Sequence, residues 1–401
     1  MKDFEQMALN VIQSAFNDGK QISVNDFDDW GAVIDELNKQ AVLPIGYDVL
    51  SKIENLDMTI KRQCVDGLSR QYQSWYIMLA QQDQLIQLLK ENGHAYVIMK
   101  GASNAVLYPE PQLRSIGDID FLVKWEEYDD VCALLLNNGY YLFGEIDHNK
   151  HHIDFIKDDI VFEMHKRPAG TKQHYSTENQ KLIDYFRAGL DQVSIAKIDG
   201  YLFCVFDPIR QGLMLLLHSA GHMQEGMGIR HLLDWGIYAD KYLSDTFWRD
   251  LFFEKVRYIK LDNLAKVMTR LCNVEFGLCK DSKWYADADK DTCDELLEYM
   301  IIQGNFGEKA RYSDRGIKLI TESIGTGGFF RRLDRSASYS MPIIVKYPLL
   351  RPVGWTYQIG RYFYKGISSG NSIRQREDEI KKGLRRKALF EKMGIYNWND
   401  S

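Results

Sequence analysis

The spacing of apolar side chains in residues 1–92 predicts a region of helices. Apolar residues recur every three or four positions, as they do on the buried face of an amphipathic helix. Two such groups are Phe4, Met7, Ala8, Val11 and Ile12, and Trp75, Met78, Leu79, Leu85, Leu88 and Leu89. Pro44 and Gly46 interrupt the pattern once, and Asn92-Gly93 ends it in the manner of a helix C-terminus.

Residues 93–200 combine short strand-like runs with helical stretches. Strands are predicted over residues 95–99, 118–123, 140–143, 152–156 and 160–165. Helices are predicted from Ser103 to Leu107 and over residues 126–137, and Lys157-Asp158-Asp159 has the composition of a tight turn. This order of elements predicts an α/β core with a mixed sheet, and the fold class is therefore α+β.

Residues 201–401 are predicted to form a C-terminal helical region. Helical spacing returns over residues 205–320, and Gly325-Thr326-Gly327-Gly328 is predicted to be a flexible break. A basic helix is predicted over residues 373–393. The sequence thus predicts three parts: helices over residues 1–92, an α/β core over 93–200, and helices over 201–401.

Composition places the chain among globular proteins and argues against several classes. Of its 401 residues, 45% are hydrophobic and 26% are charged, which allows a large core. A net charge of −6 argues against a general nucleic-acid binder. No window reaches the roughly 18 apolar residues of a membrane span, and the acidic N-terminus does not resemble a signal peptide. The six scattered cysteines predict reduced thiols, so we expect a cytoplasmic protein without a membrane partner.

Charge is unevenly distributed along the chain. The first 60 residues hold 11 acidic and 4 basic side chains, whereas residues 331–401 hold 15 basic and 6 acidic ones. One interpretation is that the two ends pack near each other or face solvent. The other is that the basic end attracts an anionic substrate or partner.

The segment Gly117-Asp118-Ile119-Asp120-Phe121-Leu122-Val123 carries the clearest chemistry. On a strand, residues two apart point to the same face, so Asp118 and Asp120 present adjacent carboxylates. Two such charges repel each other, and a divalent cation removes the conflict. Mg²⁺ prefers oxygen ligands and is commonly held by one or two carboxylates together with phosphate oxygens. The pair therefore predicts a metal site.

A third carboxylate, Glu163, stands between apolar residues in a later predicted strand. If that strand neighbours the first, three carboxylates converge. Three carboxylates can hold two metal ions, of which one activates the attacking oxygen and the other supports the leaving group. Each piece alone has an ordinary explanation, since an Asp-x-Asp is often a solvated turn and a single glutamate on a strand is often exposed. Their order along the chain favours a site.

Several cations and a glycine flank these carboxylates in the sequence. Lys100, Gly101 and Ser103 lie where a strand ends and a helix begins, a position that favours anions. Arg114 precedes Asp118 by four residues. His165 and Lys166 follow Glu163. Together these groups are candidates to neutralise a triphosphate during transfer.

These motifs resemble those of the DNA-polymerase-β-like nucleotidyltransferases. More narrowly, the chain is similar to a bacterial family of uncharacterised nucleotidyltransferases over residues 70–365. The motifs that carry the similarity are Lys100-Gly101, Tyr108-Pro109, Arg114, Gly117–Val123, Glu163-Met164-His165, Gly228–Trp235, Tyr347-Pro348-Leu349, Pro352 and Trp355. The wider superfamily has Gly-Ser or Gly-Gly in its phosphate loop. Here the Ser103 hydroxyl comes one place later, so Lys100 is a candidate to take over part of its role.

The resemblance implies transfer of a nucleoside monophosphate from a nucleoside triphosphate to an acceptor, with release of pyrophosphate. It assigns Mg²⁺ or Mn²⁺ binding to Asp118 and Asp120, and it gives Glu163 a part in the metal site and in deprotonating the acceptor hydroxyl. A sugar, a small metabolite, a peptide or protein side chain, and a tRNA end are all open as acceptors. The competing hypothesis is a non-catalytic binding or regulatory protein that retains the fold.

Histidines suggest a further, separate possibility. His218 and His222 are four apart on a predicted helix and so share a face, and His148, His151 and His152 form a second group. Either group could hold zinc, although the helix lacks the His-Glu pair of a zinc protease. The alternative is that His222, Arg230 and Asp234 line the acceptor cleft or are satisfied polar groups between helices. His165 is also a candidate for the acceptor cleft.

Overall fold

The computed structural model describes most of the chain. The described residues are 1–17, 22, 27–144, 152–168, 177–223, 226–309, 337–338, 340–341, 343–368 and 373–395. They belong to two compact units, Met1–Lys309 with Met393–Ser401, and Ala310–Lys392. The predicted break at 325–328 and the histidines His148 and His151 lie outside the described residues. The three-part division predicted from the sequence stays a prediction.

The N-terminal helices form as the apolar spacing predicts. They are α1 (Asp3–Phe16), α2 (Trp30–Lys39), α3 (Leu43–Ser51) and α4 (Met58–Glu91). Asp29 and Asp57 cap α2 and α4 by accepting hydrogen bonds from backbone N–H groups of the first turn. We expected Pro44 to interrupt the helical pattern. It lies instead in the first turn of α3, where its missing N–H costs nothing.

A five-stranded mixed sheet follows and confirms the α+β class. The strands, in spatial order, are β1 (Tyr96–Met99), β2 (Asp118–Val123), β5 (Ile160–His165), β4 (His152–Lys157) and β3 (Tyr141–Phe143). β2 and β5 are parallel, and the other neighbours are antiparallel. Asp158 and Asp159 both have positive φ and close the predicted tight turn between β4 and β5.

The two faces of this sheet differ because side chains alternate along each strand. One face is apolar: Phe121 and Phe162 are fully buried against α4 and α6 (Tyr128–Asn137). The opposite face carries Asp118, Asp120 and Glu163. Packing thus holds the strands rigid from one side and leaves the other side available for polar chemistry.

A β-hairpin that we did not predict completes the core. β6 (Ser194–Ile198) and β7 (Tyr201–Val205) are antiparallel and joined by Asp199-Gly200, both with positive φ. Ala196, Ile198, Phe203 and Val205 extend the apolar core of the sheet. The Asp-Gly pair between the two strands is a strong hairpin motif, and it is the local signal that could have predicted this hairpin.

The remaining elements are mainly helical. They are α5 (Gly101–Ala105), α7 (Thr177–Arg187), α8 (Pro208–His222), α9 (Ile229–Tyr242), α10 (Asp245–Phe247), α11 (Phe253–Tyr258), α12 (Asp262–Phe276), α13 (Lys290–Gln303), α16 (Ile343–Lys346), α17 (Arg351–Ser368) and α18 (Ile373–Lys392). Short 3₁₀ turns span Pro111–Leu113, Trp125–Glu127, Ala188–Asp191, Asn305–Gly307 and Pro348–Leu350, and a π-turn spans Trp248–Phe252.

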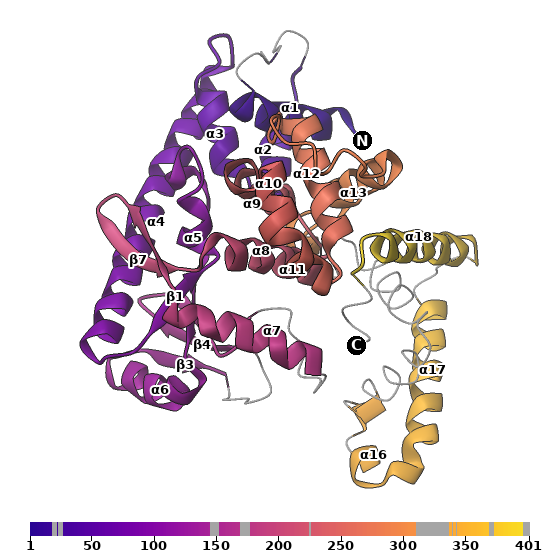
Figure 1. Ribbon diagram of the computed structural model, residues 1–401. Coiled ribbons are helices and arrows are strands. Elements are labelled where there is room, and N and C mark those ends of the chain that lie inside the picture. Colours follow the sequence, from indigo (N-terminus) through magenta and orange to yellow (C-terminus); the bar gives the residue numbers. More distant parts are fainter. Residues whose placement is uncertain are drawn as a thin grey trace. The chain divides into compact units, whose positions relative to one another are not determined.

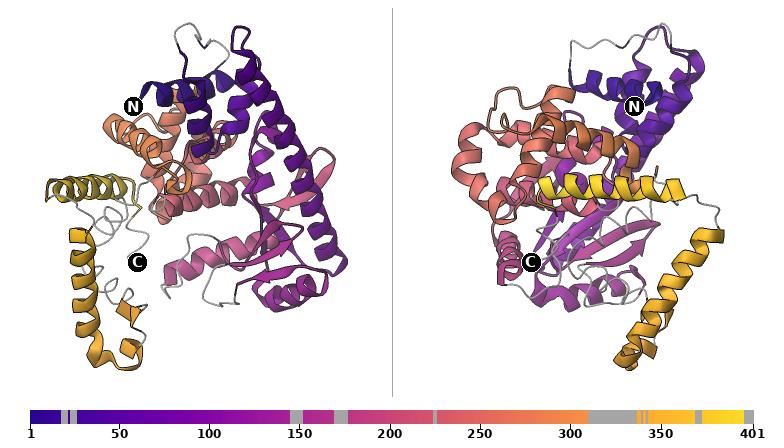
Figure 2. Two further views of the ribbon diagram at one scale, coloured as in Figure 1. Left: turned by 180° about the vertical axis from the view of Figure 1, so that it is seen from behind. Right: turned by 90° about the vertical axis from the view of Figure 1, so that its right-hand side faces the viewer.

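Figure 1 shows α4 running past the N-terminal helix α3 and then past the sheet, and α4 contacts α3, β2 and β7. Both views in Figure 2 agree with this arrangement. The long helix therefore joins the helical layer of the first unit to its sheet. Among the described residues, no helix is both long enough and apolar enough to cross a lipid bilayer.

Candidate active site

Three carboxylates converge on the polar face of the sheet. The parallel pairing of β2 and β5 sets Asp120 directly opposite Glu163, and Asp118 lies two residues earlier on the same face. One carboxylate oxygen from each of the three lies within 4.8 Å of the others. Asp120 is 1% exposed, whereas Asp118 and Glu163 are half-buried. The convergence that the sequence suggested depends on this one strand pairing.

Two cationic side chains contact these carboxylates. The Nζ of Lys100 donates a hydrogen bond of 2.5 Å to Oδ1 of Asp120 and lies 3.6 Å from Oε2 of Glu163. His165 is fully buried beneath them, with Nε2 2.9 Å from the same Oδ1 and 3.3 Å from the Glu163 oxygen. Oδ2 of Asp120 is buried and has no hydrogen-bond partner in the described part of the chain. This oxygen is therefore available to bind a further cation.

Burial and mutual repulsion separate the pKa values of the carboxyl groups. Burial, with the charges of Asp120 and Glu163, raises the pKa of Asp118 to about 7. Burial also acts to raise the pKa of Glu163, but His165 and Lys100 outweigh it and hold that pKa far below its usual range. Glu163 is therefore ionised at neutral pH, and Asp118 is only partly so.

The same interactions act on the two cations. Burial acts to lower the pKa of Lys100, but Asp120 and Glu163 outweigh it and raise that pKa. Burial likewise opposes charge on His165, and the contacts with Asp120 and Glu163 raise the pKa of its imidazole. The carboxylates thus favour the charged forms of both Lys100 and His165.

The carboxylates line a cavity of about 370 Å³ between the sheet and helices α8 and α9. The residues around it are Lys100, Gly101, Arg114–Asp118, Asp120, His152, Glu163, Leu217, His218, Gly221, His222, Arg230 and Phe306. The volume falls within the roughly 300–1,000 Å³ of small-molecule sites. The cavity therefore offers one polar wall from the sheet and a second wall rich in histidine.

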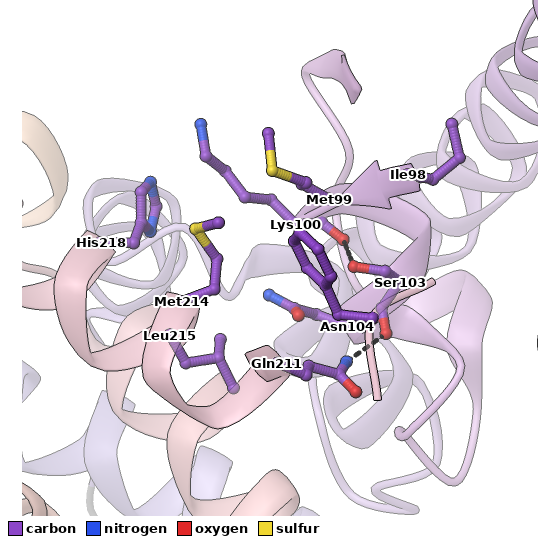
Figure 3. Close-up of a pocket in the computed structure, with 10 residues that line it drawn as sticks. Ile98, Met99, Lys100, Ser103, Asn104, Gln211, Met214, Leu215 and His218 are labelled. Carbon is purple, nitrogen blue, oxygen red and sulfur yellow. Dashed lines mark hydrogen bonds between the residues drawn. The ribbon is translucent and has the colours of Figure 1, made fainter. Parts of the chain in front are cut away.

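Helix α8 also fixes the loop that carries Lys100. Figure 3 shows Gln211, Met214, Leu215 and His218 of α8 facing Met99, Lys100, Ser103 and Asn104. They enclose a space of only about 10 Å³, so the contact is tightly packed. Gln211 donates to the Ser103 carbonyl at 2.7 Å, and the Ser103 hydroxyl donates to the Lys100 carbonyl at 2.8 Å. Ser103 is thus buried behind the loop.

The backbone of Lys100 is itself unusual. Its φ is 49° and its ψ is −131°, a conformation that side-chain-bearing residues rarely adopt. Holding one residue there costs on the order of 1–3 kcal/mol. The hydrogen bonds through Ser103 and the Nζ contact with Asp120 offset this cost and direct the ammonium toward the carboxylates.

Arg114 and Asp234 form a closed ion pair rather than two free groups. Nε and Nη2 of Arg114 each lie 2.7 Å from an oxygen of Asp234, and Nη1 donates to the Gly101 carbonyl at 3.0 Å. Tyr108 donates to the same carboxylate at 2.8 Å. Both charged side chains are about 6% exposed. The sequence assigned Arg114 to the nucleotide and left Asp234 either in the acceptor cleft or as a satisfied polar group between helices. The structure pairs the two side chains with each other.

Lys166 lies on the opposite face of the sheet from the carboxylates. Side chains alternate along a strand, so the residue after His165 points toward the apolar face. Its Nζ lies 5.2 Å from the centre of the Trp125 ring and 5.4 Å from that of Tyr128, and the residue is 2% exposed. The structure therefore gives this lysine a cation–π environment away from the cavity.

Arg230 and His222 do line the cavity, as the sequence suggested. No ion pair to the Arg230 guanidinium is found among the described residues. Burial, together with the nearby Arg114, lowers the pKa of Arg230, so an anion in the cavity would stabilise its charge. His152, which the sequence had grouped with His148 and His151 as a zinc candidate, also lines this cavity, and His231, which no sequence pattern singled out, lies beside it.

Comparison with known proteins identifies the class to which this site belongs. Residues 26–277 match the profile of a family described as "Uncharacterised nucleotidyltransferase". The match spans more than half of the chain, and the chain therefore belongs to that nucleotidyltransferase family. The match includes all three carboxylates and the Arg114–Asp234 pair.

One solved structure is similar over part of the chain. It is the crystal structure of an antigenic nucleotidyltransferase-like protein from Paracoccidioides brasiliensis, with 16% sequence identity and a TM-score of 0.26. The similarity covers 39% of this chain and 71% of that one. Among functionally curated proteins, no sequence matches this chain.

Proposed function

We propose that this protein transfers a nucleoside monophosphate from a nucleoside triphosphate to a hydroxyl-bearing acceptor. The observation that carries the proposal is the set of three carboxylates in a 370 Å³ cavity of a chain that belongs to a nucleotidyltransferase family. In the reaction the acceptor oxygen bonds to the α-phosphorus, the bond to the β-phosphate oxygen breaks, and pyrophosphate leaves. The hydroxyl proton passes to a base in the cavity.

The carboxylate set fits Mg²⁺ or Mn²⁺. All its donors are oxygens, which these ions prefer, and the buried Oδ2 of Asp120 has no partner in the described structure. Asp118, Asp120 and Glu163 would hold the metal. When bound, such a cation neutralises phosphate charge and makes an attached oxygen more reactive.

Lys100 and Arg230 are the groups we assign to the triphosphate. Both line the cavity, and Arg230 has no ion-pair partner in the described part of the chain. Lys100 is held by Asp120 and Glu163 while no other cation is present. With these carboxylates neutralised by a bound metal, the Lys100 ammonium would contact a phosphate oxygen at little electrostatic cost.

Glu163 is the base we assign to the acceptor hydroxyl. The pKa of its carboxyl group is lowered by His165 and Lys100, so in this state it is a weak base. The carboxyl group is nevertheless ionised, so one of its oxygens would accept the hydroxyl proton as the acceptor oxygen bonds to the α-phosphorus.

Calorimetric titration with each of the four nucleoside triphosphates tests the proposal. We expect Mg²⁺-dependent binding of at least one of them by the wild type and its loss in D118N/D120N, which keeps the side-chain volumes. Asp287→Asn is the matched control, since its exposed carboxylate pairs with Lys266 at the surface. Binding that persists in the double variant, or that ignores Mg²⁺, would refute the assignment of the site.

A further inference from the structure

Three histidines meet on the second wall of the cavity. His218 and His222 are one turn apart on α8, and His231 comes from the facing helix α9. The centres of their rings are 4.2, 4.7 and 5.2 Å apart, and one nitrogen of each lies within 4.8 Å of the others. The helical spacing of the sequence pointed to the first two. The third reaches them only through the packing of two helices.

Their hydrogen bonding is incomplete. His231 is 2% exposed, and neither of its ring nitrogens makes a hydrogen bond of good geometry within the described residues; the Gly228 backbone acts on its imidazole only as the smallest of several influences. The Nε2 atoms of His218 and His222 lie 2.8 Å apart, so each imidazole has only the other to satisfy that nitrogen. Buried polar atoms are almost always paired. The nitrogens of the three imidazoles face one another, and several of them lack a hydrogen-bond partner in the part of the chain that the structure describes. This arrangement indicates that a ligand can bind between them.

The cluster is neutral in its present state. Burial lowers the pKa of His222 to about 4, aided by the positive charges of Lys100 and Arg230. Burial and the neighbouring histidine lower the pKa values of His218 and His231 well below their ordinary range. Asp120 and Glu163 act in the opposite direction on His222. Neutral imidazole is the form that binds metal ions, so no proton has to leave before one can bind.

Contacts of Gly226 and Phe306 hold this wall in place. Gly226 has a φ of 127°, and a Cβ there would come within 2.1 Å of the Gly307 backbone nitrogen, so only glycine fits. Phe306 donates its backbone N–H to the Gly226 carbonyl at 3.0 Å, and its ring meets that of His222 edge-on at 4.8 Å. The position of His222 is therefore fixed by contacts with Gly226 and Phe306.

We propose that His218, His222 and His231 form a binding site for a transition-metal cation of the zinc class. Such ions favour imidazole and bind its nitrogen at about 2.0–2.1 Å, which places two ligands about 3.3 Å apart around a tetrahedral centre. Small side-chain movements would open the 2.8 Å contact to that separation. Three protein ligands leave a fourth position, and His218 and His222 line the cavity, so that position faces it.

This site differs in chemistry from the carboxylate set. Mg²⁺ prefers oxygen and would not be retained by three nitrogens, whereas zinc-class ions bind imidazole well. The proposal does not rest on nucleotidyl transfer, and it survives if the carboxylates prove to have another role.

Titration of the metal-free, untagged full-length chain with Co²⁺ tests the site. Co²⁺ substitutes for zinc and absorbs visible light in a low-coordinate nitrogen environment. We expect one equivalent per chain to produce this absorption, and Zn²⁺ to displace it. The substitutions His222→Gln and His231→Gln should each weaken binding by more than the roughly 10- to 100-fold that loss of an outer-shell partner costs.

Two controls separate the possible outcomes. His94 contacts Glu127 and is not part of the histidine cluster, so His94→Gln should leave the titration unchanged. D118N/D120N should also retain the Co²⁺ absorption, even if it abolishes triphosphate binding. Circular dichroism checks that each variant folds, and nitrogen couplings in the electron paramagnetic resonance spectrum of the Cu²⁺-loaded wild type test the ligands without any substitution. Absence of stoichiometric binding by the wild type, absence of these couplings, or loss of binding only with the aspartates would overturn the proposal.

Discussion

Two buried ion-pair clusters lie close to the same cavity but are built differently. In the first, Arg114 meets Asp234 through two hydrogen bonds of 2.7 Å, and one positive charge balances one negative charge. In the second, Lys100 and His165 share Asp120 and Glu163, with Asp118 beside them. The first cluster is closed and electrically complete, whereas the second has surplus carboxylate capacity. We infer that the first holds the structure together and the second holds a ligand.

The closed cluster joins two segments that lie far apart in the sequence. Arg114 precedes the aspartate pair and Asp234 lies on α9, 120 residues later. Their pairing ties the loop before β2 to the helix that carries Arg230 and His231. The geometry of the cavity thus depends on a pair that need not touch a substrate.

Removing Asp234 should give the largest change and test the closed cluster. Asp234→Ala leaves Arg114 buried without a partner, and breaking such a pair costs about 3–5 kcal/mol of unfolding free energy. Chemical denaturation measures this change. Asp287→Ala, at an exposed pair with Lys266, should cost no more than about 1 kcal/mol. Equal losses of unfolding free energy in the two variants would contradict the structural role of the buried pair.

Substitution of Arg230 should affect binding more than folding. Charge-assisted hydrogen bonds are worth about 1.5–3 kcal/mol, so Arg230→Ala should weaken triphosphate binding by about 10- to 100-fold. Its thermal stability should not fall, because within the described structure no ion pair is lost. Arg230→Lys keeps the charge and should recover part of the affinity. An unchanged dissociation constant in the alanine variant would separate Arg230 from the triphosphate.

The open cluster should also respond to pH. Burial and the neighbouring carboxylates raise the pKa of Asp118 to about 7, so below that pH a proton competes with a metal ion for this side chain. Mn²⁺ affinity should therefore rise as pH increases through 7 and fall by up to about tenfold per unit below it. Calorimetry between pH 6 and 8 measures this trend. Asp118→Asn should flatten it, and a flat profile in the wild type would contradict the assignment.

Ser103→Ala should have the smallest effect. Its hydroxyl already donates to the Lys100 carbonyl and is buried away from the cavity. Loss of this hydrogen bond should lower the unfolding free energy by about 1 kcal/mol. Triphosphate affinity should stay within about twofold of the wild type. A tenfold loss of affinity without a change in stability would instead make this hydroxyl a phosphate ligand.

The sequence predicted the positions of individual strands better than the pairing between them. Alternating apolar residues located the five strands, and the two-residue spacing correctly placed Asp118 and Asp120 on one face. Sequence alone did not determine that Glu163 would join them. That depends on the parallel pairing of β2 with β5, and pairings between distant strands are set by tertiary packing.

The same reasoning explains the residues that were placed differently. Lys166 follows His165 directly, and the alternation of side chains already implied that the two point to opposite faces. Arg114 pairs with Asp234 on α9, and no local sequence pattern predicts a contact between such distant residues. His231 is nine positions after His222 and on another helix, so no spacing rule connects them. Contacts between separate elements were thus the part that sequence patterns could not supply.

The parallel pairing of β2 with β5 also has a consequence for when the site comes into being. Parallel neighbours cannot be joined by a tight turn, and here α6, β3 and β4 all intervene before β5 is reached. Asp120 and His165 are 45 residues apart, so their contact waits for a large loop to close. We infer that the three carboxylates come together only once β5 has paired with β2. If the proposed metal site exists, tight metal binding would therefore report that this strand pairing has formed.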